Sequence, residues 1–301
     1  MISSIESQKS QGNEFALYCD NDLKQIINEI IKESQFVVSK ETIKEIYNKT
    51  NITQEKLIEI FIEKAKTFSS PKISEYRVGA VGVDSCGNYY LGCNIEFIGS
   101  TLDQTIHGEQ FVVINCLKNG ANKLEAIFVS APPCGYCRQF LNELEDGKNL
   151  TICFGDGSKK LLSHFLVNSF GPENLGMKGG LLTRSENNIV IQNSNDPLIK
   201  QAIEAARSSY APYTNSFAGC AIQTNDNTIY SGGCIENAAY NPTISPFQAA
   251  AVDLISSGNL LINIKNVVLV EGKSSKVSYA AQIESILKTI NKDISIIVIN
   301  Y

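Results

Sequence analysis

One stretch of this chain recurs later in it. Residues 79–96 (GAVGVDSCGNYYLGCNIE) align without a gap on residues 219–236 (GCAIQTNDNTIYSGGCIE), and five of the eighteen positions are identical. Each stretch follows a helical pattern and a turn that contains a proline, Pro71 or Pro212. The alternative is two unrelated hairpins with glycine turns. The matching order of elements before and after each stretch favours a duplicated unit instead.

The residue patterns around each copy predict alternating strands and helices. In the first copy, residues 78–83 and 88–93 predict a hairpin, and residues 125–130 predict a buried strand. Residues 109–120 and 137–144 predict helices. Before them, residues 20–66 show Ile, Leu, Lys and Glu at helical spacing, with a break near Thr50–Asn51. We therefore expect an α/β fold in two copies behind a helical N-terminal segment.

Composition and charge exclude several classes of protein. The net charge is −5 and no basic stripe is present, which argues against nucleic acid as substrate or partner. No apolar run approaches the roughly 20 residues that cross a bilayer, so no membrane association is expected. The first fifteen residues lack the apolar core of a secretory signal. We expect a cytoplasmic protein whose nine cysteines are mostly reduced.

Cys134 and Cys137 form a C-x-x-C pair in the stretch APPCGYCRQF. Such a pair can be half of a structural zinc site, a redox dithiol, or two incidental thiols at a helix start. No second C-x-x-C exists to close a structural site. A strand is predicted just before the pair, as in thioredoxin-like proteins, so the local sequence does not exclude a redox dithiol.

His107, in the stretch TIHGEQ, favours a catalytic metal site. One imidazole and two thiolates make a tetrahedral zinc site whose fourth position is open to water. His107 and Cys134 each open a predicted helix, and Cys137 lies one turn after Cys134 on the same face. Glu109 is too close to His107 to share the metal easily, but it can accept a proton from the water. This arrangement suits hydrolysis at an amidine-like carbon with loss of ammonia.

These motifs resemble the zinc-dependent cytidine deaminases, for which His-x-Glu followed by Pro-Cys-x-x-Cys is a signature. The resemblance also rests on YRVGAV, GCNIEFIGSTLDQTIHGEQ, PCGYCRQFLNEL, SFGPENLGMK and YAPYTNSFAG…GGCIENAAYNPTISPFQAA. It covers most of the chain beyond residue 50. It implies a three-layer α-β-α cytidine deaminase-like fold, duplicated, with an active first copy and a degenerate second copy, in a homodimer.

The resemblance also implies roles for individual residues. His107, Cys134 and Cys137 match the ligands of one Zn²⁺ per chain, and Glu109 matches the proton shuttle. Asn94 and Glu96 match residues that bind the ribose hydroxyls. The residues expected beside the base are Tyr76, where the family usually has phenylalanine, Gly108, where it usually has alanine, and Phe170. Outside the family context, Asn94 and Glu96 could simply close a turn, and the two aromatic residues could be core residues.

The second copy lacks the metal ligands. Ser245 and Phe247 stand where the histidine and glutamate should follow, Cys234 replaces the partner of Asn94, and no C-x-x-C follows residues 267–272. This copy is expected to be structural. We predict a helical N-terminal segment (1–53), a catalytic zinc-binding domain (54–155), a connection (156–194) and a degenerate deaminase-like domain (195–301).

The reaction that the resemblance implies is hydrolytic deamination of free cytidine and deoxycytidine to uridine and deoxyuridine plus ammonia, in pyrimidine salvage. Zinc-activated hydroxide attacks C4 while Glu109 shuttles the protons. Two rival functions remain at this point. One is a zinc-binding scaffold without activity, and the other is cytosine editing in RNA or DNA.

Overall fold

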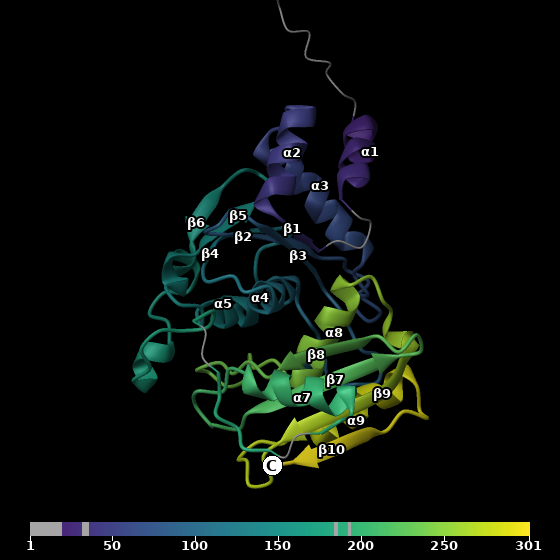
Figure 1. Ribbon diagram of the computed structural model, residues 1–301. Helices are drawn as coiled ribbons and strands as arrows, with labels where there is room; N and C mark the ends of the chain where they lie inside the picture. The colour runs from purple at the N-terminus through teal and green to yellow at the C-terminus, as the bar shows by residue number, and fades with distance from the viewer. Residues whose placement is uncertain (1–19, 32–35, 184–185, 192–193) are drawn as a thin grey trace, which may run out of the picture.

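The computed structural model describes residues 20–31, 36–183, 186–191 and 194–301. Two α/β units follow one another, each with a sheet flanked by helices (Figure 1). The N-terminal helices α1 (Asp20–Ile30), α2 (Lys40–Thr50) and α3 (Gln54–Thr67) pack beside the first sheet. In the described part of the chain, no helix is long and apolar enough to span a bilayer.

The first sheet has six strands in the order β1-β3-β2-β4-β5-β6. Only β4 and β5 run parallel to each other, and the other neighbours are antiparallel. Helix α3 covers one face, and α4 (Gly108–Lys118) and α5 (Gly135–Leu141) lie on the other, giving three layers (Figure 1). The strands are β1 (Val37–Val38), β2 (Gly79–Asp84), β3 (Tyr89–Cys93), β4 (Leu124–Val129), β5 (Thr151–Phe154) and β6 (Lys159–Leu161).

The second sheet has four strands in the order β10-β9-β7-β8, and again one pair, β9 and β10, is parallel. Its strands are β7 (Ala218–Thr224), β8 (Ile229–Gly233), β9 (Ile264–Glu271) and β10 (Ile296–Asn300). The associated helices are α7 (Pro197–Arg207), α8 (Pro246–Ser256) and α9 (Ala280–Ile290). Strand by strand, β7-β8-β9-β10 repeats β2-β3-β4-β5.

The duplication extends to single backbone contacts. β2 shifts register between Val83 and Asp84, and β7 shifts between Gln223 and Thr224. The bridge between Ile95 and Ile106 recurs between Ile235 and Ile244. Unrelated hairpins would not share a bulge and a distant bridge at the same positions. The predicted duplicated α-β-α fold is confirmed.

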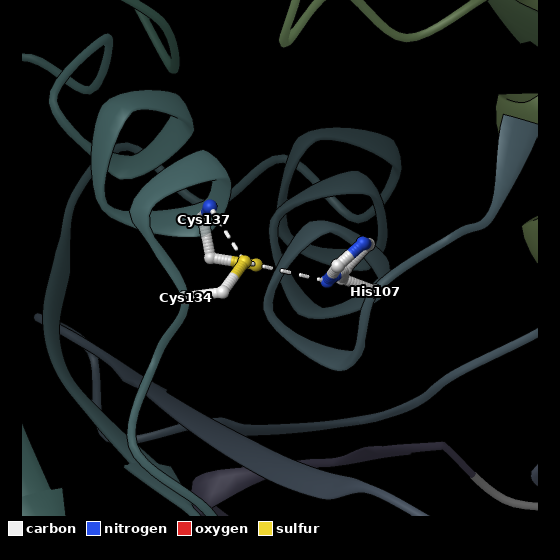
Figure 2. A group of neighbouring side chains, drawn as sticks. All are labelled: His107, Cys134 and Cys137. Carbon is white, nitrogen blue, oxygen red and sulfur yellow. Dashed lines mark hydrogen bonds between the residues drawn. The ribbon is translucent and has the colours of Figure 1, made fainter. Parts of the chain in front are cut away.

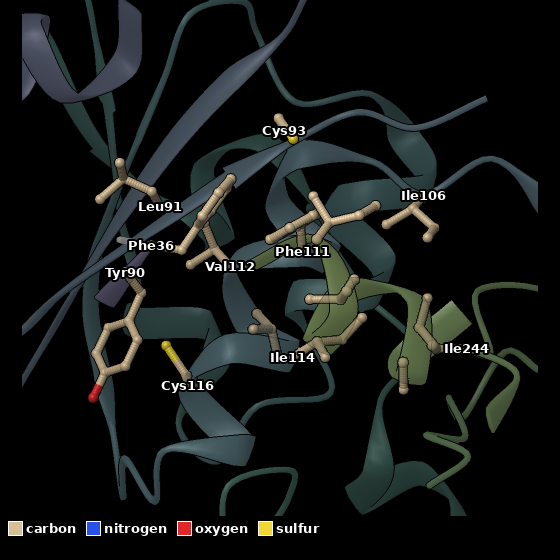
Figure 3. Close-up of a cluster of buried hydrophobic side chains, with 14 of the residues drawn as sticks. Phe36, Tyr90, Leu91, Cys93, Ile106, Phe111, Val112, Ile114, Cys116 and Ile244 are labelled. Atoms are coloured by element: carbon tan, nitrogen blue, oxygen red, sulfur yellow. The ribbon is translucent and has the colours of Figure 1, made fainter. Parts of the chain in front are cut away.

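The hydrophobic core is continuous between the two units. In Figure 3, Ile106 of the first unit lies near Ile244 of the second unit, and both belong to the same buried cluster as Ile114 of α4. Hydrogen bonds also cross the boundary, because Gln248 on α8 donates to the carbonyl of Gln104 at 2.9 Å. Helices α4 and α8 therefore face each other across the boundary.

The break between the N-terminal helices near Thr50–Asn51 lies where the sequence predicts it. Helix α2 ends at Thr50, and Asn51 adopts a left-handed conformation with φ of 50°. Thr53 then caps α3 by accepting a hydrogen bond from the Lys56 N–H. The segment also supplies β1 and the buried Phe36, whose ring stacks on Phe111 of α4 at 5.2 Å. The sequence pattern did not predict this two-residue strand.

The stretch from 156 to 194 is not only a connection, since β6 extends the first sheet and α6 (Leu162–Phe165) follows it. The residues around His164 form only this single turn rather than a longer helix. Strand β6 was not predicted because its three residues are all exposed and show no alternation of burial.

Candidate active site

His107 lies at the N-terminal end of α4, where a helix start was predicted. It is the N-cap residue, and its own N–H donates to Oε1 of Gln110 at 2.9 Å. The helix approaches β3 closely, because a Cβ on Gly92 would lie 2.3 Å from the carbonyl oxygen of Gly108. Only glycine allows this contact, which sets the position of His107 over the sheet.

The two cysteines lie at the start of α5, also as predicted. Cys134 is the N-cap residue, and its Sγ accepts a hydrogen bond from the Cys137 N–H at 3.4 Å. The Cys134 side chain is exposed, whereas Cys137 is buried. The first turns of α4 and α5 lie next to each other, and the imidazole points at the sulfur atoms (Figure 2).

These three side chains can hold a metal ion. Their ligand atoms all lie within 4.8 Å of one another, and Cys134 Sγ is 3.7 Å from His107 Nδ1. Among the described residues, no other three His, Cys, Asp or Glu side chains form such a group. Two thiolates and one imidazole fit Zn²⁺ in a tetrahedral site with one open position. A structural site would need a fourth protein ligand.

The three candidate ligands shift one another's pKa values. The Cys137 thiol donates to the Cys134 sulfur and lowers the pKa of Cys134 to about 3, and the nearby His107 adds to this effect. The same shared proton, together with burial, raises the pKa of Cys137. Burial lowers the pKa of His107, but contact with Cys134 and the charges of Glu109 and Glu96 outweigh it, so the pKa is raised. Metal binding therefore requires loss of the Cys137 proton and of any proton on the His107 ligand nitrogen, whereas Cys134 is already a thiolate.

Glu109 is buried beside the cysteines, with 4% of its surface exposed. Burial raises the pKa of its carboxyl group, although hydrogen bonds with its own N–H and the Cys137 thiol oppose the shift. A raised pKa makes a carboxyl group a better proton acceptor than an exposed glutamate.

Asn94 and Glu96 lie at the end of β3 and hold the 73–78 loop. Asn94 Oδ1 accepts from the Val78 N–H, and Nδ2 donates to the Tyr76 carbonyl, both at 2.9 Å. Glu96 accepts from the N–H groups of Ile73 and Ser74 and from the Ser74 hydroxyl, at 2.7, 2.9 and 2.5 Å. Burial would raise the pKa of Glu96, but these bonds outweigh it and lower the pKa.

The residues expected beside the base differ in exposure. Gly108 is buried in the first turn of α4. The side chain of Tyr76 is 60% exposed and that of Phe170 is 46% exposed, so neither is a core aromatic. The Phe170 carbonyl accepts from Gln139 and Asn142 at 2.9 and 3.1 Å, next to the helix that carries the cysteines.

The second copy keeps the fold of the site without its chemistry. Ser245 is the N-cap of α8, as His107 is of α4, and its N–H donates to Gln248 as that of His107 does to Gln110. Phe247, in the place of Glu109, is fully buried. Apolar packing has replaced the carboxylate.

Ser74 is a residue that the sequence analysis missed. Its N–H and hydroxyl hold the Glu96 carboxylate, and Thr214 holds Glu236 in the same way in the second copy. Extending the alignment of the two copies upstream by five residues would have paired Ser74 with Thr214.

Comparisons with known proteins show which family the chain belongs to. The family described as the cytidine and deoxycytidylate deaminase zinc-binding region matches residues 51–153 and again residues 162–284. A cytidine deaminase of Vibrio vulnificus is 36% identical over 89% of this chain and 91% of its own length. One of Photorhabdus laumondii is 40% identical over 74% of this chain and 76% of its own.

The similarity to solved structures covers a smaller part of this chain. The cytidine deaminase of Mycobacterium tuberculosis is 25% identical, with a TM-score of 0.36, and covers 40% of this chain and 99% of its own.

Proposed function

Because the chain belongs to the cytidine deaminase family, we propose that it hydrolyses free cytidine and deoxycytidine to uridine and deoxyuridine, releasing ammonia. The observation that carries this proposal is the group of His107, Cys134 and Cys137 with the buried carboxyl group of Glu109 beside it. A structural zinc site has no need of that carboxyl group. An open zinc site that catalyses hydrolysis needs such a group to transfer protons.

Zinc held by His107, Cys134 and Cys137 would lower the pKa of water and supply the nucleophile. Glu109 accepts the proton that this water loses and delivers it to N3 of the cytosine ring. Glu109 then takes the second proton of the same water, from the new hydroxyl group at C4, and passes it to the amino group, which leaves as ammonia while the C4 carbonyl forms. Water and cytidine thus give uridine and ammonia, and Glu109 ends in the state in which it began. Its burial suits it to hold and release a proton in turn.

Asn94 and Glu96 are proposed to bind the ribose hydroxyls. A carboxylate offers about four acceptor sites, and Glu96 uses three of them on Ile73 and Ser74. One site remains for a hydroxyl donor. The Asn94 amide likewise keeps one hydrogen and one lone pair after its bonds to Tyr76 and Val78. A carboxylate at this position would repel a 3′-phosphate, which favours a nucleoside over a polynucleotide.

Tyr76, Gly108 and Phe170 are proposed to enclose the base. The two aromatic side chains are exposed in the single chain, so they are free to cover a bound ring. The main chain at Gly108 would approach the base, since it lies between the ligand His107 and the proton carrier Glu109.

The wider setting is also a proposal. We propose a homodimer that acts in pyrimidine salvage in the cytoplasm, without a nucleic-acid partner. The eight cysteines in the described part of the chain are free thiols, as expected in a reducing compartment. The domain limits are proposed at 1–53, 54–155, 156–194 and 195–301.

One assay separates this proposal from its two rivals. Purified protein is first analysed for zinc, and equal amounts are then given cytidine, deoxycytidine, or a single-stranded oligonucleotide that contains cytosine. We expect bound zinc and release of ammonia from the two nucleosides only. Zinc without turnover of any substrate would favour the scaffold, and turnover of the oligonucleotide alone would favour editing.

A further inference from the structure

Tyr136, the second residue between the two cysteines, lies against His107. Its ring centroid is 5.7 Å from that of the imidazole, and the two planes differ by only 22°. Offset stacking at this separation is attractive and restricts rotation of both rings. The imidazole also contacts Cys134 Sγ through Nδ1 at 3.7 Å, so the Tyr136 ring is a second side chain that touches it. The stacked ring is therefore a direct restraint on the imidazole plane.

The hydroxyl of Tyr136 reaches the second copy. It donates to the main-chain carbonyl of Asn241 at 2.6 Å, a residue 105 positions further along the chain. Asn241 is exposed and follows Tyr240, which has a positive φ of 61°. The acceptor thus belongs to the tight turn that precedes α8.

Two more residues, on α5 and just after it, hold this turn. Gln139 exchanges hydrogen bonds with the Asn237 side chain at 3.1 and 3.3 Å. Glu143 accepts from the Ala238 N–H at 2.8 Å and is fully buried. Gln139 lies one turn after Tyr136 on α5, and Glu143 follows two residues after the helix ends at Leu141. Residues 136–143 thus contact the 237–241 turn at Asn237, Ala238 and Asn241.

We propose that Tyr136 is a positioning residue through which the 237–241 turn of the second copy orients His107. The Tyr136 ring restrains the imidazole, and the Asn241 carbonyl restrains the ring. The degenerate copy thereby contributes to the metal site of its own chain. This inference rests on the proposed role of His107 as a zinc ligand.

The test measures metal binding directly in the full-length protein. Tyr136→Phe removes only the hydroxyl, and Tyr136→Leu removes the stacked ring as well. Tyr301→Phe is the matched control, since its hydroxyl also donates to a main-chain carbonyl, that of Phe217 at 2.9 Å, within the second copy. The zinc Kd is measured by competition with a chromophoric chelator, and the absorption spectrum of the Co²⁺-substituted protein reports ligand geometry.

We expect a zinc Kd about threefold higher in Tyr136→Phe and about tenfold higher in Tyr136→Leu, in line with one lost hydrogen bond and one lost aromatic contact. The Co²⁺ spectrum should change in both variants, and Tyr301→Phe should match the unmodified protein. Unchanged Kd values and spectra in both Tyr136 variants would overturn the inference. Failure of the unmodified protein to bind zinc would instead overturn the proposed function.

A double variant tests the path through the turn. Asn237→Ala releases the turn, because the Asn237 side chain also accepts from the Ala239 N–H at 2.9 Å. Once the turn is released, loss of the Tyr136 hydroxyl should add less than about twofold to the zinc Kd. If the effects of the two substitutions on the zinc Kd instead multiply in full, the hydroxyl acts independently of the turn and the proposed coupling is wrong.

Discussion

Gly108 lies between His107, the proposed metal ligand, and Glu109, the proposed proton carrier. A Cβ at this position would be 3.3 Å from Val78 Cγ1 and 3.5 Å from the Ala80 side chain. Both neighbours are side-chain atoms, and a shift of a few tenths of an ångström at Val78 relieves the closer contact. The position therefore tolerates a methyl group but leaves no room for a larger side chain.

We predict that Gly108→Ala keeps or modestly improves stability and activity. Alanine gains up to about 1 kcal/mol over glycine inside a helix, and less in the first turn. Thermal unfolding and kcat/KM for cytidine would check this. A large loss of kcat/KM would show that the site needs glycine, whereas Gly108→Val should lose activity in either case.

At the residue scale, the sequence was most informative where chemistry requires a particular side chain. His107, Glu109, Cys134 and Cys137 could be picked out because few alternatives serve a metal site. Ser74 and Tyr136 could not be found in this way, since a serine and a tyrosine in loops and helix starts are common. Their importance comes from what they contact in space.

At the element scale, Gly92 determines how closely α4 packs on β3. A Cβ there would meet the Gly108 carbonyl oxygen at 2.3 Å and the Val112 nitrogen at 2.9 Å. The second copy has the same arrangement, with Gly232 against the Ala250 nitrogen at 2.4 Å. Because main-chain atoms are involved, the helix as a whole would have to move.

We predict that Gly92→Ala destabilises the protein by about 3 kcal/mol, at the upper end for overpacking a core. It should also weaken zinc binding, since the displaced helix begins at His107. Gly155→Ala is the control, because nothing lies within 4 Å of a Cβ at that position. Denaturant unfolding of both variants measures the difference, and equal stabilities would contradict the role given to Gly92.

The elements that the sequence predicted were those with a strong residue pattern. The hairpin of β2 and β3, the start of α4 and the break at Asn51 all lie where expected. Strands β1 and β6 were missed because they have two and three residues, too few for any periodicity. The pairing of β1 depends on the distant strand β3, whereas β6 pairs with β5, which directly precedes it in the chain.

At the scale of the whole molecule, the two copies differ in role. The first copy carries the proposed catalytic residues, and the second copy has a structural role. The second copy repeats the strand order and the helix caps, but Ser245 and Phe247 replace the ligand and the carboxylate. The repeat predicted this division from sequence. The contacts that join the copies, such as Tyr136 with Asn241 and Glu143 with Ala238, could not be predicted, because ordinary polar residues far apart in the chain form them.

The central claim is that one zinc site per chain, in the first copy, performs hydrolysis with Glu109 as its proton carrier. Glu109→Gln tests it most directly, because the amide keeps the shape of the side chain but cannot shuttle a proton. The measurement is zinc per chain together with the rate of uridine formation from cytidine. We predict about one zinc per chain in both proteins and a loss in kcat of about 10²- to 10⁴-fold in the variant. Near-normal uridine formation by a zinc-loaded Glu109→Gln protein would contradict the claim.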